Sequence, residues 1–142
     1  MWNRGQALVT RRQVVEVEGL GHGAQPIPLA VRMGPLLTTG GISGVDRASG
    51  EIPADADAEV ANLFANVAAV LEAAGADAAA VAKMTFFVRD RSLRDAINRQ
   101  WVAMFPEAAD RPARHTLVHD LPGRMQVQAE VLAFISDAEA SA

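Results

Sequence analysis

The chain of 142 residues contains no cysteine and no tyrosine. Without cysteine it has no disulfide bonds, no thiolate nucleophile and no cysteine metal ligands. Acidic residues outnumber basic ones, the formal net charge is −4 and no basic run is present, so we expect no nucleic-acid partner. The longest apolar runs are far below the roughly 18 residues that span a bilayer, so we expect no membrane partner either.

The overall composition is typical of a folded, soluble protein, with 50% apolar and 21% charged residues. A chain of this length forms one domain that buries about two-thirds of its unfolded surface. The N-terminal segment shows neither the continuous apolar stretch nor the cleavage pattern of a secretory signal, so we expect a cytoplasmic protein. We predict a single domain over residues 1–142, in which 1–25 form an N-terminal extension and 136–142 a frayed tail.

The clearest helix is predicted around residues 60–74. Apolar side chains recur there at three and four residues and form one apolar stripe. Asp55 or Asp57 is placed to cap the start, and Gly75 stands where a left-handed residue ends a helix. The stripe consists of Val60, Leu63, Phe64, Val67, Val70, Leu71 and Ala74.

A second helix is predicted between Ser92 and Pro106. Ser92 and Asp95 have the spacing of a capping box, and Pro106 ends the helix. Arginines cluster around its start, and we interpret them as a solvated face. They are Arg89, Arg91, Arg94 and Arg99. The expected buried face consists of Leu93, Ile97, Trp101 and Met104.

Alternation, β-branched and aromatic residues, and flanking turn residues predict the strands. Apart from a candidate edge strand at the start, the order of elements is β-β-α-β-α-β-β. This order predicts an α+β fold in which a single mixed sheet carries both helices on one face. The strands are expected at 13–18, 29–32, 36–43, 81–88, 113–119 and 126–135.

The last strand leaves one face of the sheet without a cover. Alternate residues of this strand are apolar and face the helices, whereas the residues between them mix polar and apolar side chains. Such a face suggests burial against other subunits rather than contact with water alone. We therefore expect a symmetric homo-oligomer. The mixed face consists of Gln126, Gln128, Glu130, Leu132 and Phe134.

One arginine and one glutamate carry the chemical interpretation. Arg114 lies in the extended segment Arg111-Pro-Ala-Arg114-His-Thr116, and Glu130 lies in the last strand. An arginine clamps a planar carboxylate through two parallel N–H bonds, and a nearby glutamate orients or deprotonates a water. We expect strand alternation to place both side chains in one pocket. The pair then suggests hydrolysis of a small molecule that carries a carboxylate, without a metal.

Simpler interpretations compete with this chemistry. Arg114 alone would also fit a strand arginine in a salt bridge, and Glu130 would fit a charge that protects a sheet edge. His115 and His119, four residues apart on a strand, lie too far apart to share a metal. His22, in a glycine-rich loop, is expected to be exposed.

A succession of stretches, from about residue 26 to residue 134, resembles the reactive intermediate deaminase (Rid) family, which hydrolyses enamines and imines. No single motif carries the resemblance; their order along the chain does. The stretches are Leu36-Leu-Thr-Thr-Gly40, Asn66-Val-Ala-Ala-Val-Leu-Glu-Ala-Ala-Gly75, Val81-Ala-Lys-Met-Thr-Phe-Phe-Val-Arg-Asp90, Ile97-Asn98, Arg111-Pro-Ala-Arg114, Leu121-Pro122 and Gln128-Ala-Glu130.

The resemblance implies a fold similar to that of the trimeric bacterial chorismate mutase, with active sites between the subunits of a homotrimer and no cofactor. It implies that Arg114 binds the substrate carboxylate and that Glu130 helps to hold the attacking water. The backbone carbonyl of Thr116 would assist with that water. The remaining substrate-binding positions would be Thr39, Gly40, Asn98 and, where the family often has a loop tyrosine, Ile27 or Pro26.

The chain departs from the family pattern at three positions. The loop tyrosine is missing, Thr116 replaces a common cysteine, and Gly41 replaces a common glutamine. These changes keep the carboxylate clamp and reshape the pocket wall, which indicates a divergent member with its own substrate preference.

The reaction that the resemblance implies is hydrolysis of a 2-imino acid to a 2-oxo acid and ammonia. Two alternatives stay open: a deaminase of a larger unsaturated amino acid, of the aminomuconate type, and a non-catalytic ligand-binding or regulatory trimer. Chorismate mutase chemistry would need several cationic groups around a dicarboxylate, and only Arg114 is identified as such a group.

Overall fold

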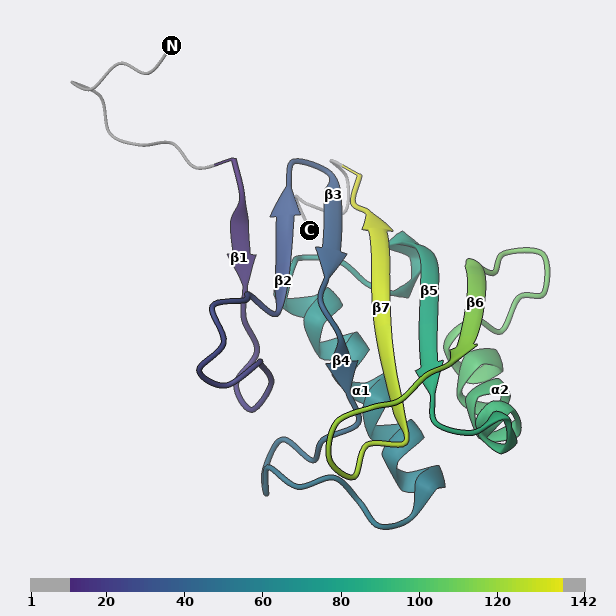
Figure 1. Cartoon of the computed structure of the whole chain (residues 1–142). Helices are drawn as coiled ribbons and strands as arrows, with labels where there is room; N and C mark the ends of the chain where they lie inside the picture. The colour runs from purple at the N-terminus through teal and green to yellow at the C-terminus, as the bar shows by residue number, and fades with distance from the viewer. Residues whose placement is uncertain (1–10, 137–142) are drawn as a thin grey trace.

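The computed structural model describes residues 11–136 and contains one seven-stranded sheet with two α-helices behind it (Figure 1). The strand order is β1-β2-β3-β7-β5-β6, and β4 also pairs with β7. The predicted α+β fold, with both helices on one face of a mixed sheet, is confirmed. The strands are β1 (Gln13–Val15), β2 (Ala30–Met33), β3 (Leu36–Thr39), β4 (Ile42–Ser43), β5 (Val81–Val88), β6 (Ala113–Val118) and β7 (Val127–Phe134). The helices are α1 (Ala56–Ala73), α2 (Arg94–Met104) and the 3-10 turns η1 (Ala78–Ala80) and η2 (Arg91–Leu93).

The sheet is antiparallel except at one pair. Strands β5 and β6 run parallel, and α2 forms the crossover that joins them. As a result β6 is an edge strand beside α2, whereas β7 lies in the middle of the sheet, between β3 and β5 (Figure 1). Neither helix of the described residues is long and apolar enough to cross a membrane.

Helix α1 begins and ends at the residues that the sequence indicated. The Asp55 carboxylate accepts a hydrogen bond from the Ala58 N–H at 3.1 Å, which caps the first turn. Gly75 adopts a φ of +81°, the left-handed conformation that follows a helix end. Arg32, on β2, donates to the carbonyl of Ala74 at 2.8 Å and so satisfies a carbonyl at the helix C-terminus.

The predicted capping box of α2 is wrong. Ser92 lies inside the turn η2, and its N–H donates to the Asp90 carboxylate at 2.7 Å. Helix α2 begins only at Arg94 and has no side-chain cap. The chain therefore passes from β5 into a 3-10 turn capped by Asp90. This turn determines the residue at which α2 begins.

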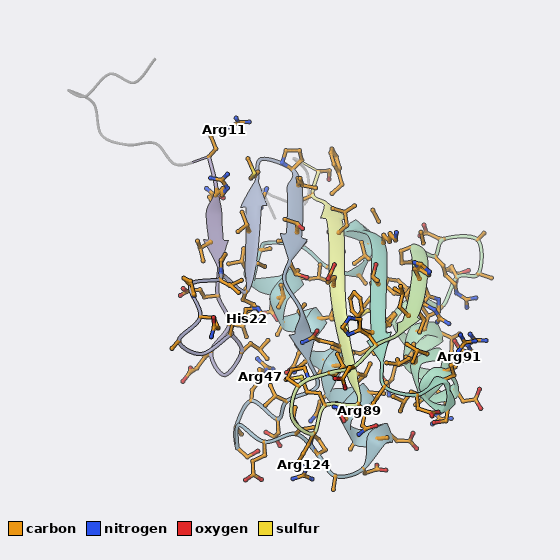
Figure 2. All side chains as sticks on the ribbon, in the orientation of Figure 1. Arg11, His22, Arg47, Arg89, Arg91 and Arg124 are labelled. Carbon is orange, nitrogen blue, oxygen red and sulfur yellow. The ribbon has the colours of Figure 1, made fainter. Side chains whose placement is uncertain are left out.

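A long connection joins β6 to β7 across the end of β5, and Arg89 holds it in place (Figure 2). The Arg89 guanidinium donates to the carbonyls of Leu121, Gly123 and Met125. It also pairs with Asp120 at 3.2 Å. Because four acceptors converge on one guanidinium, the loop is tied to the end of β5, directly before β7 begins.

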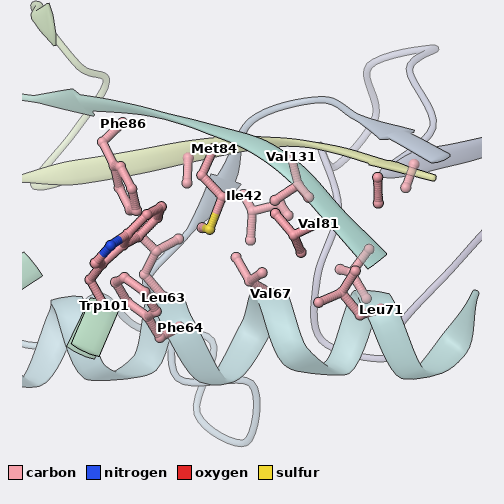
Figure 3. Packing of buried hydrophobic residues seen from close by; sticks show 14 of the residues in the cluster. Ile42, Leu63, Phe64, Val67, Leu71, Val81, Met84, Phe86, Trp101 and Val131 are labelled. Carbon is pink, nitrogen blue, oxygen red and sulfur yellow. The ribbon is translucent and has the colours of Figure 1, made fainter. Parts of the chain in front are cut away.

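The apolar core fills the space between the sheet and the helices (Figure 3). Phe86, on β5, stacks on Phe64 of α1 at a centroid distance of 5.6 Å and meets Trp101 of α2 edge-on at 6.3 Å. Alternate residues of β7 are buried against the helices, as the sequence predicted. Met104, predicted to be buried, is only partly so.

The opposite sheet face is open and partly apolar. Glu130, Leu132 and Phe134 of β7 are exposed on it, and Leu36 of β3 is exposed beside Phe134, its partner across the strands. The first strand ends at Val15, earlier than expected. Of the predicted tail, only Ser136 belongs to the described residues; residues 137–142, and residues 1–10 of the N-terminal extension, lie outside them.

Candidate active site

Arg114 projects from β6 toward α2. Its strand neighbour is Met84 of β5, which is fully buried under the helices, so Arg114 belongs to the row of side chains on the helix face. The Arg114 Nη2 donates to the Oδ1 of Asn98 on α2 at 2.7 Å. The guanidinium carbon lies 5.0 Å from the centroid of the Trp101 ring, in cation–π geometry. Two residues of α2 thus hold Arg114 in one orientation.

Arg114 is also a cation without a counter-ion in the described residues. Partial burial lowers its pKa from the ordinary value, and the nearby positive charge of Arg94 lowers it further. Arginine nevertheless stays protonated at neutral pH. A guanidinium carries five N–H donors, and Asn98 accepts only one of them. The remaining donors are free to bind an anion.

Thr116 lies two residues along β6 and shares the helix face with Arg114. Its side chain is half-buried. Because β6 pairs only with β5 among the described residues, its other edge carries unpaired backbone groups. The role predicted for the Thr116 carbonyl stays a prediction.

Glu130 lies on the other face of the sheet. It is exposed, and its cross-strand neighbours are Thr85 of β5 and, one strand further, His115 of β6. The expectation that Arg114 and Glu130 share a pocket is wrong for a single chain. The reason is the strand register. Arg114 pairs with Met84, and Met84 pairs with Val131, so these three side chains share one face. Glu130 is the next residue along β7 from Val131 and therefore points to the other face.

Thr39 and Gly40 lie next to Glu130 at a β-bulge. Leu132 pairs with Thr38, whereas Ala129 pairs with Ile42, so one strand has an extra residue between these pairs. The Thr39 hydroxyl accepts the N–H of Val131 at 2.9 Å and donates to the carbonyl of Gly40 at 2.8 Å. The hydroxyl predicted to contact substrate is therefore engaged with the backbone.

Gly41 lies close to the side chain of Gln128. A Cβ atom at Gly41 would lie 2.7 Å from the side chain of Gln128, which is the residue of β7 that packs over the bulge. The atoms that the Cβ would meet belong to the amide end of this flexible side chain, so a larger residue at Gly41 would displace the Gln128 amide, two residues before Glu130.

Ile27 lies in the loop between β1 and β2 and is 53% exposed. It borders an open hollow formed by that loop, together with His22 and Leu29. The expectation that His22 is exposed is wrong in part. The residue lies in this loop (Figure 2) and is half-buried. Its Nε2 atom is buried near Gly40 without a hydrogen-bond partner in the described residues.

Glu59 is a buried carboxylate that we did not predict from the sequence. It lies in the first turn of α1, fully buried, and its Oε2 accepts the N–H groups of Gln126 and Val127 at 2.8 and 3.3 Å. Burial raises its pKa from the ordinary value, although the two N–H bonds and the positive charge of Arg89 oppose the shift. Its burial could have been predicted, because Glu59 lies four residues before Leu63 and so falls on the apolar stripe of the helix.

The predicted residues thus form two groups, and Arg114 of one group and Glu130 of the other stand on opposite faces of the sheet. The first, called here the clamp group, consists of Arg114, Asn98 and Thr116 at β6 and α2. The second, called here the bulge group, consists of Thr39, Gly40 and Glu130 at β3 and β7, with Ile27 in the preceding loop. Within residues 11–136 no three His, Asp or Glu side chains come together in a way that could hold a metal ion.

The chain, with this sheet and its two helices, matches a known family. The family model described as endoribonuclease L-PSP matches residues 24–135, and the chain belongs to this family, the Rid family of reactive intermediate deaminases.

Curated relatives cover most of the chain. A RutC family protein from Haemophilus influenzae is 34% identical over 124 residues, which is 85% of this chain and 95% of the relative. A protein from Escherichia coli K12 named 2-iminobutanoate/2-iminopropanoate deaminase is 34% identical over 123 residues, 85% of this chain and 96% of the relative.

Solved structures share the fold. RidA from an Antarctic Psychrobacter superposes with a TM-score of 0.79 at 26% identity, over 87% of this chain and all of that one. TdcF from Escherichia coli, solved with bound serine, superposes with a TM-score of 0.79 at 28% identity, over 87% of this chain and 99% of that one.

Proposed function

We propose that this protein hydrolyses 2-imino acids to 2-oxo acids and ammonia. Membership of the Rid family supports the proposal, as does similarity to the E. coli protein named for that reaction. The observation that carries it is Arg114: half-buried, oriented by Asn98 and Trp101, and without a carboxylate partner in the described residues. An arginine held in this way is suited to bind a carboxylate ligand.

In the proposed mechanism Arg114 holds the substrate carboxylate and thereby positions the adjacent imine carbon. Asn98 acts as a positioning residue, because its Oδ1 holds one Nη of the guanidinium. A water held by Glu130, assisted by the Thr116 carbonyl, attacks the imine carbon. Glu130 takes a proton from this water and returns one to the nitrogen. This addition gives a carbinolamine. Its hydroxyl proton then passes to the nitrogen by way of Glu130 as the carbon–nitrogen bond breaks, so that ammonia leaves and the 2-oxo acid remains.

The two residue groups can act on one substrate only if two copies of the chain meet. We propose a homotrimer in which the clamp group of one copy faces the bulge group of the next, with each site between subunits. Two features of the chain support this arrangement. Edge strand β6 has an unpaired edge, and the open sheet face exposes Leu132 at 42% and Phe134 at 62%. Burial of such a face against another subunit is favourable.

The first experiment generates 2-iminopropanoate in place with an amino-acid oxidase and follows its decay with and without the protein. We expect faster decay in the presence of wild-type protein and no acceleration with Arg114→Ala. Arg114→Lys is the matched variant, because it retains the charge but loses the two parallel N–H donors. Equal decay with and without wild-type protein would contradict the proposal. Ligand binding without turnover would instead favour a binding or regulatory trimer.

A further inference from the structure

Beside Arg114 there is a small hollow that contains Thr116 and two arginines that the proposed mechanism does not use. It is lined by Val88, Arg91, Arg94, Thr116 and Val118, and its volume is about 90 Å³. Because one water occupies roughly 30 Å³ in the liquid, this space is sufficient for one carboxylate group. The lining combines two arginines, Thr116 and one valine from each of β5 and β6.

The hollow lies two residues along β6 and one helical turn along α2 from the Arg114–Asn98 pair. Thr116 follows Arg114 by two residues on the same face of β6, a step of about 6.6 Å. Arg94 precedes Asn98 by four residues on α2, one helical turn or about 6 Å. The hydrogen bond from Arg114 to Asn98 fixes the strand and the helix relative to each other. Arg94 therefore stands beside Thr116, displaced from Arg114 by roughly one such step in the same direction.

Neither arginine of the hollow forms an ion pair with a carboxylate of the described residues. The ion pairs near α2 involve Arg89 with Asp120 and Arg99 with Asp57. Two carboxylates lie close by in sequence, Asp90 and Asp95. Asp90 accepts the N–H of Ser92, and Asp95, in the first turn of α2, forms no ion pair with an arginine of the described residues. Like charges held together without counter-ions repel each other, which favours a bound anion.

The electrostatic effect of Arg94 on Arg114 agrees with this arrangement. The positive charge of Arg94 lowers the pKa of Arg114, so the two guanidinium groups are close enough to repel each other. An anion bound between them would relieve that repulsion. The initial interpretation of the arginines as a solvated face holds for Arg91, Arg94 and Arg99, which are exposed, and is wrong for Arg89, which is half-buried. Of the three exposed arginines, Arg99 pairs with Asp57, whereas Arg91 and Arg94 line the hollow.

We propose that this hollow receives a second carboxylate, so that the preferred substrates are 2-imino acids with an acidic side chain. The inference rests on the proposed imine hydrolysis and narrows its substrate class. An extended chain of about five or six carbons separates two carboxylates by a distance comparable to the step between Arg114 and the hollow. This class includes the larger, aminomuconate type of substrate that the reshaped pocket wall left open.

The test compares two imines of equal carbon number, made in place from glutamate and from norvaline. They differ only in ending with a carboxylate or with a methyl group. We expect wild-type kcat/KM to be about tenfold higher for the glutamate imine, as a lost charged contact of this kind commonly changes affinity by that order. Arg94→Gln should abolish this preference and leave the norvaline imine within about twofold. Arg99→Gln, on the same helix and outside the hollow, is the matched control.

A binding measurement keeps the inference testable if turnover is absent. Calorimetry with the two corresponding 2-oxo acids should show tighter binding of the dicarboxylate, and Arg94→Gln should remove the difference. Equal binding of both acids would overturn the inference. Binding preference without hydrolysis of either imine would refute the proposed deaminase activity and leave the dicarboxylate site standing. If Arg94→Gln changes the oligomeric mass but not the preference, the arginines serve a subunit contact and the inference is overturned.

Discussion

Arg114 and Glu130 point to opposite faces of the same sheet, although only strand β5 separates the strands that carry them. Two side chains on opposite faces of one sheet cannot both contact one small substrate within a single chain. The proposed hydrolysis therefore requires an oligomer, because Arg114 and Glu130 must come from different copies of the chain. This requirement also provides a direct genetic test of where the active site lies.

The first prediction concerns mixed oligomers. Arg114→Ala and Glu130→Ala should each be inactive alone, because each lacks one half of every site. When the two variants are co-expressed or refolded together, sites that combine an intact clamp group with an intact bulge group should form at random. We expect about one quarter of wild-type activity, since each site needs the correct copy on both sides. The same mixture made from two differently tagged Arg114→Ala chains should stay inactive, and so would the test mixture if each chain held a complete site.

The second prediction concerns Asn98 as a positioning residue. Asn98→Ala removes the acceptor for the Arg114 Nη2 and leaves the guanidinium held only by Trp101. We expect kcat/KM for 2-iminopropanoate to fall by about 10-fold to 100-fold, as is typical when a residue that orients a binding group is lost. The melting temperature should change little, because Asn98 is exposed. Gln100→Ala, elsewhere on α2, is the control; an unchanged KM and kcat in Asn98→Ala would contradict the assignment.

Local patterns were sufficient to predict much of the fold. The stripe from Val60 onward, with Asp55 before it and Gly75 after it, predicted α1 within a few residues. The β-branched and aromatic run at 81–88 predicted β5 with its observed bounds. Both signals depend on spacing within one segment, and burial on one side of that segment is enough to produce them.

The candidate site was less predictable because it depends on pairing between segments. Which face Arg114 occupies is set by the register of β6 on β5 and of β5 on β7, and a shift of one residue would reverse it. The bulge at Thr39 is visible only when β3, β4 and β7 are paired. The wrong capping box at Ser92 has a similar origin, since the 3-10 turn before α2 takes the residues that a capping box would need.

The third prediction concerns the hydroxyl of Thr39. Thr39→Val keeps a similar shape but leaves the N–H of Val131 without its acceptor. We expect a loss of about 1–3 kcal/mol in the free energy of unfolding, the usual cost of an unsatisfied buried donor. Thr39→Ser should retain most of the stability. Thr38→Val, at an exposed neighbouring position, should change stability by less than about 0.5 kcal/mol. Urea unfolding of the three variants decides the matter, and equal stabilities of Thr39→Val and Thr38→Val would show that the hydroxyl does not hold the bulge.

The last prediction concerns the pH dependence conferred by Glu59. Burial raises its pKa in the folded chain above the ordinary value of 4.5, so the folded state binds this proton more tightly than the unfolded state does. The stability that the protonated group contributes is therefore fully present below pH 4.5 and is lost as the pH rises through the folded pKa. Glu59→Gln removes the titration but keeps an oxygen to accept the N–H groups of Gln126 and Val127.

We expect the difference in unfolding free energy between wild type and Glu59→Gln to shift in favour of the glutamine variant as the pH rises above 4.5. Urea unfolding of both proteins at a series of pH values from acid to neutral measures this difference. Glu59→Ala is the companion variant: it leaves both N–H groups unpaired and should be less stable than Glu59→Gln at every pH, by about 1–3 kcal/mol. A difference between wild type and Glu59→Gln that shifts the opposite way would mean that the N–H bonds and Arg89 outweigh burial. In that case Glu59 would be an ionised anchor at the start of β7.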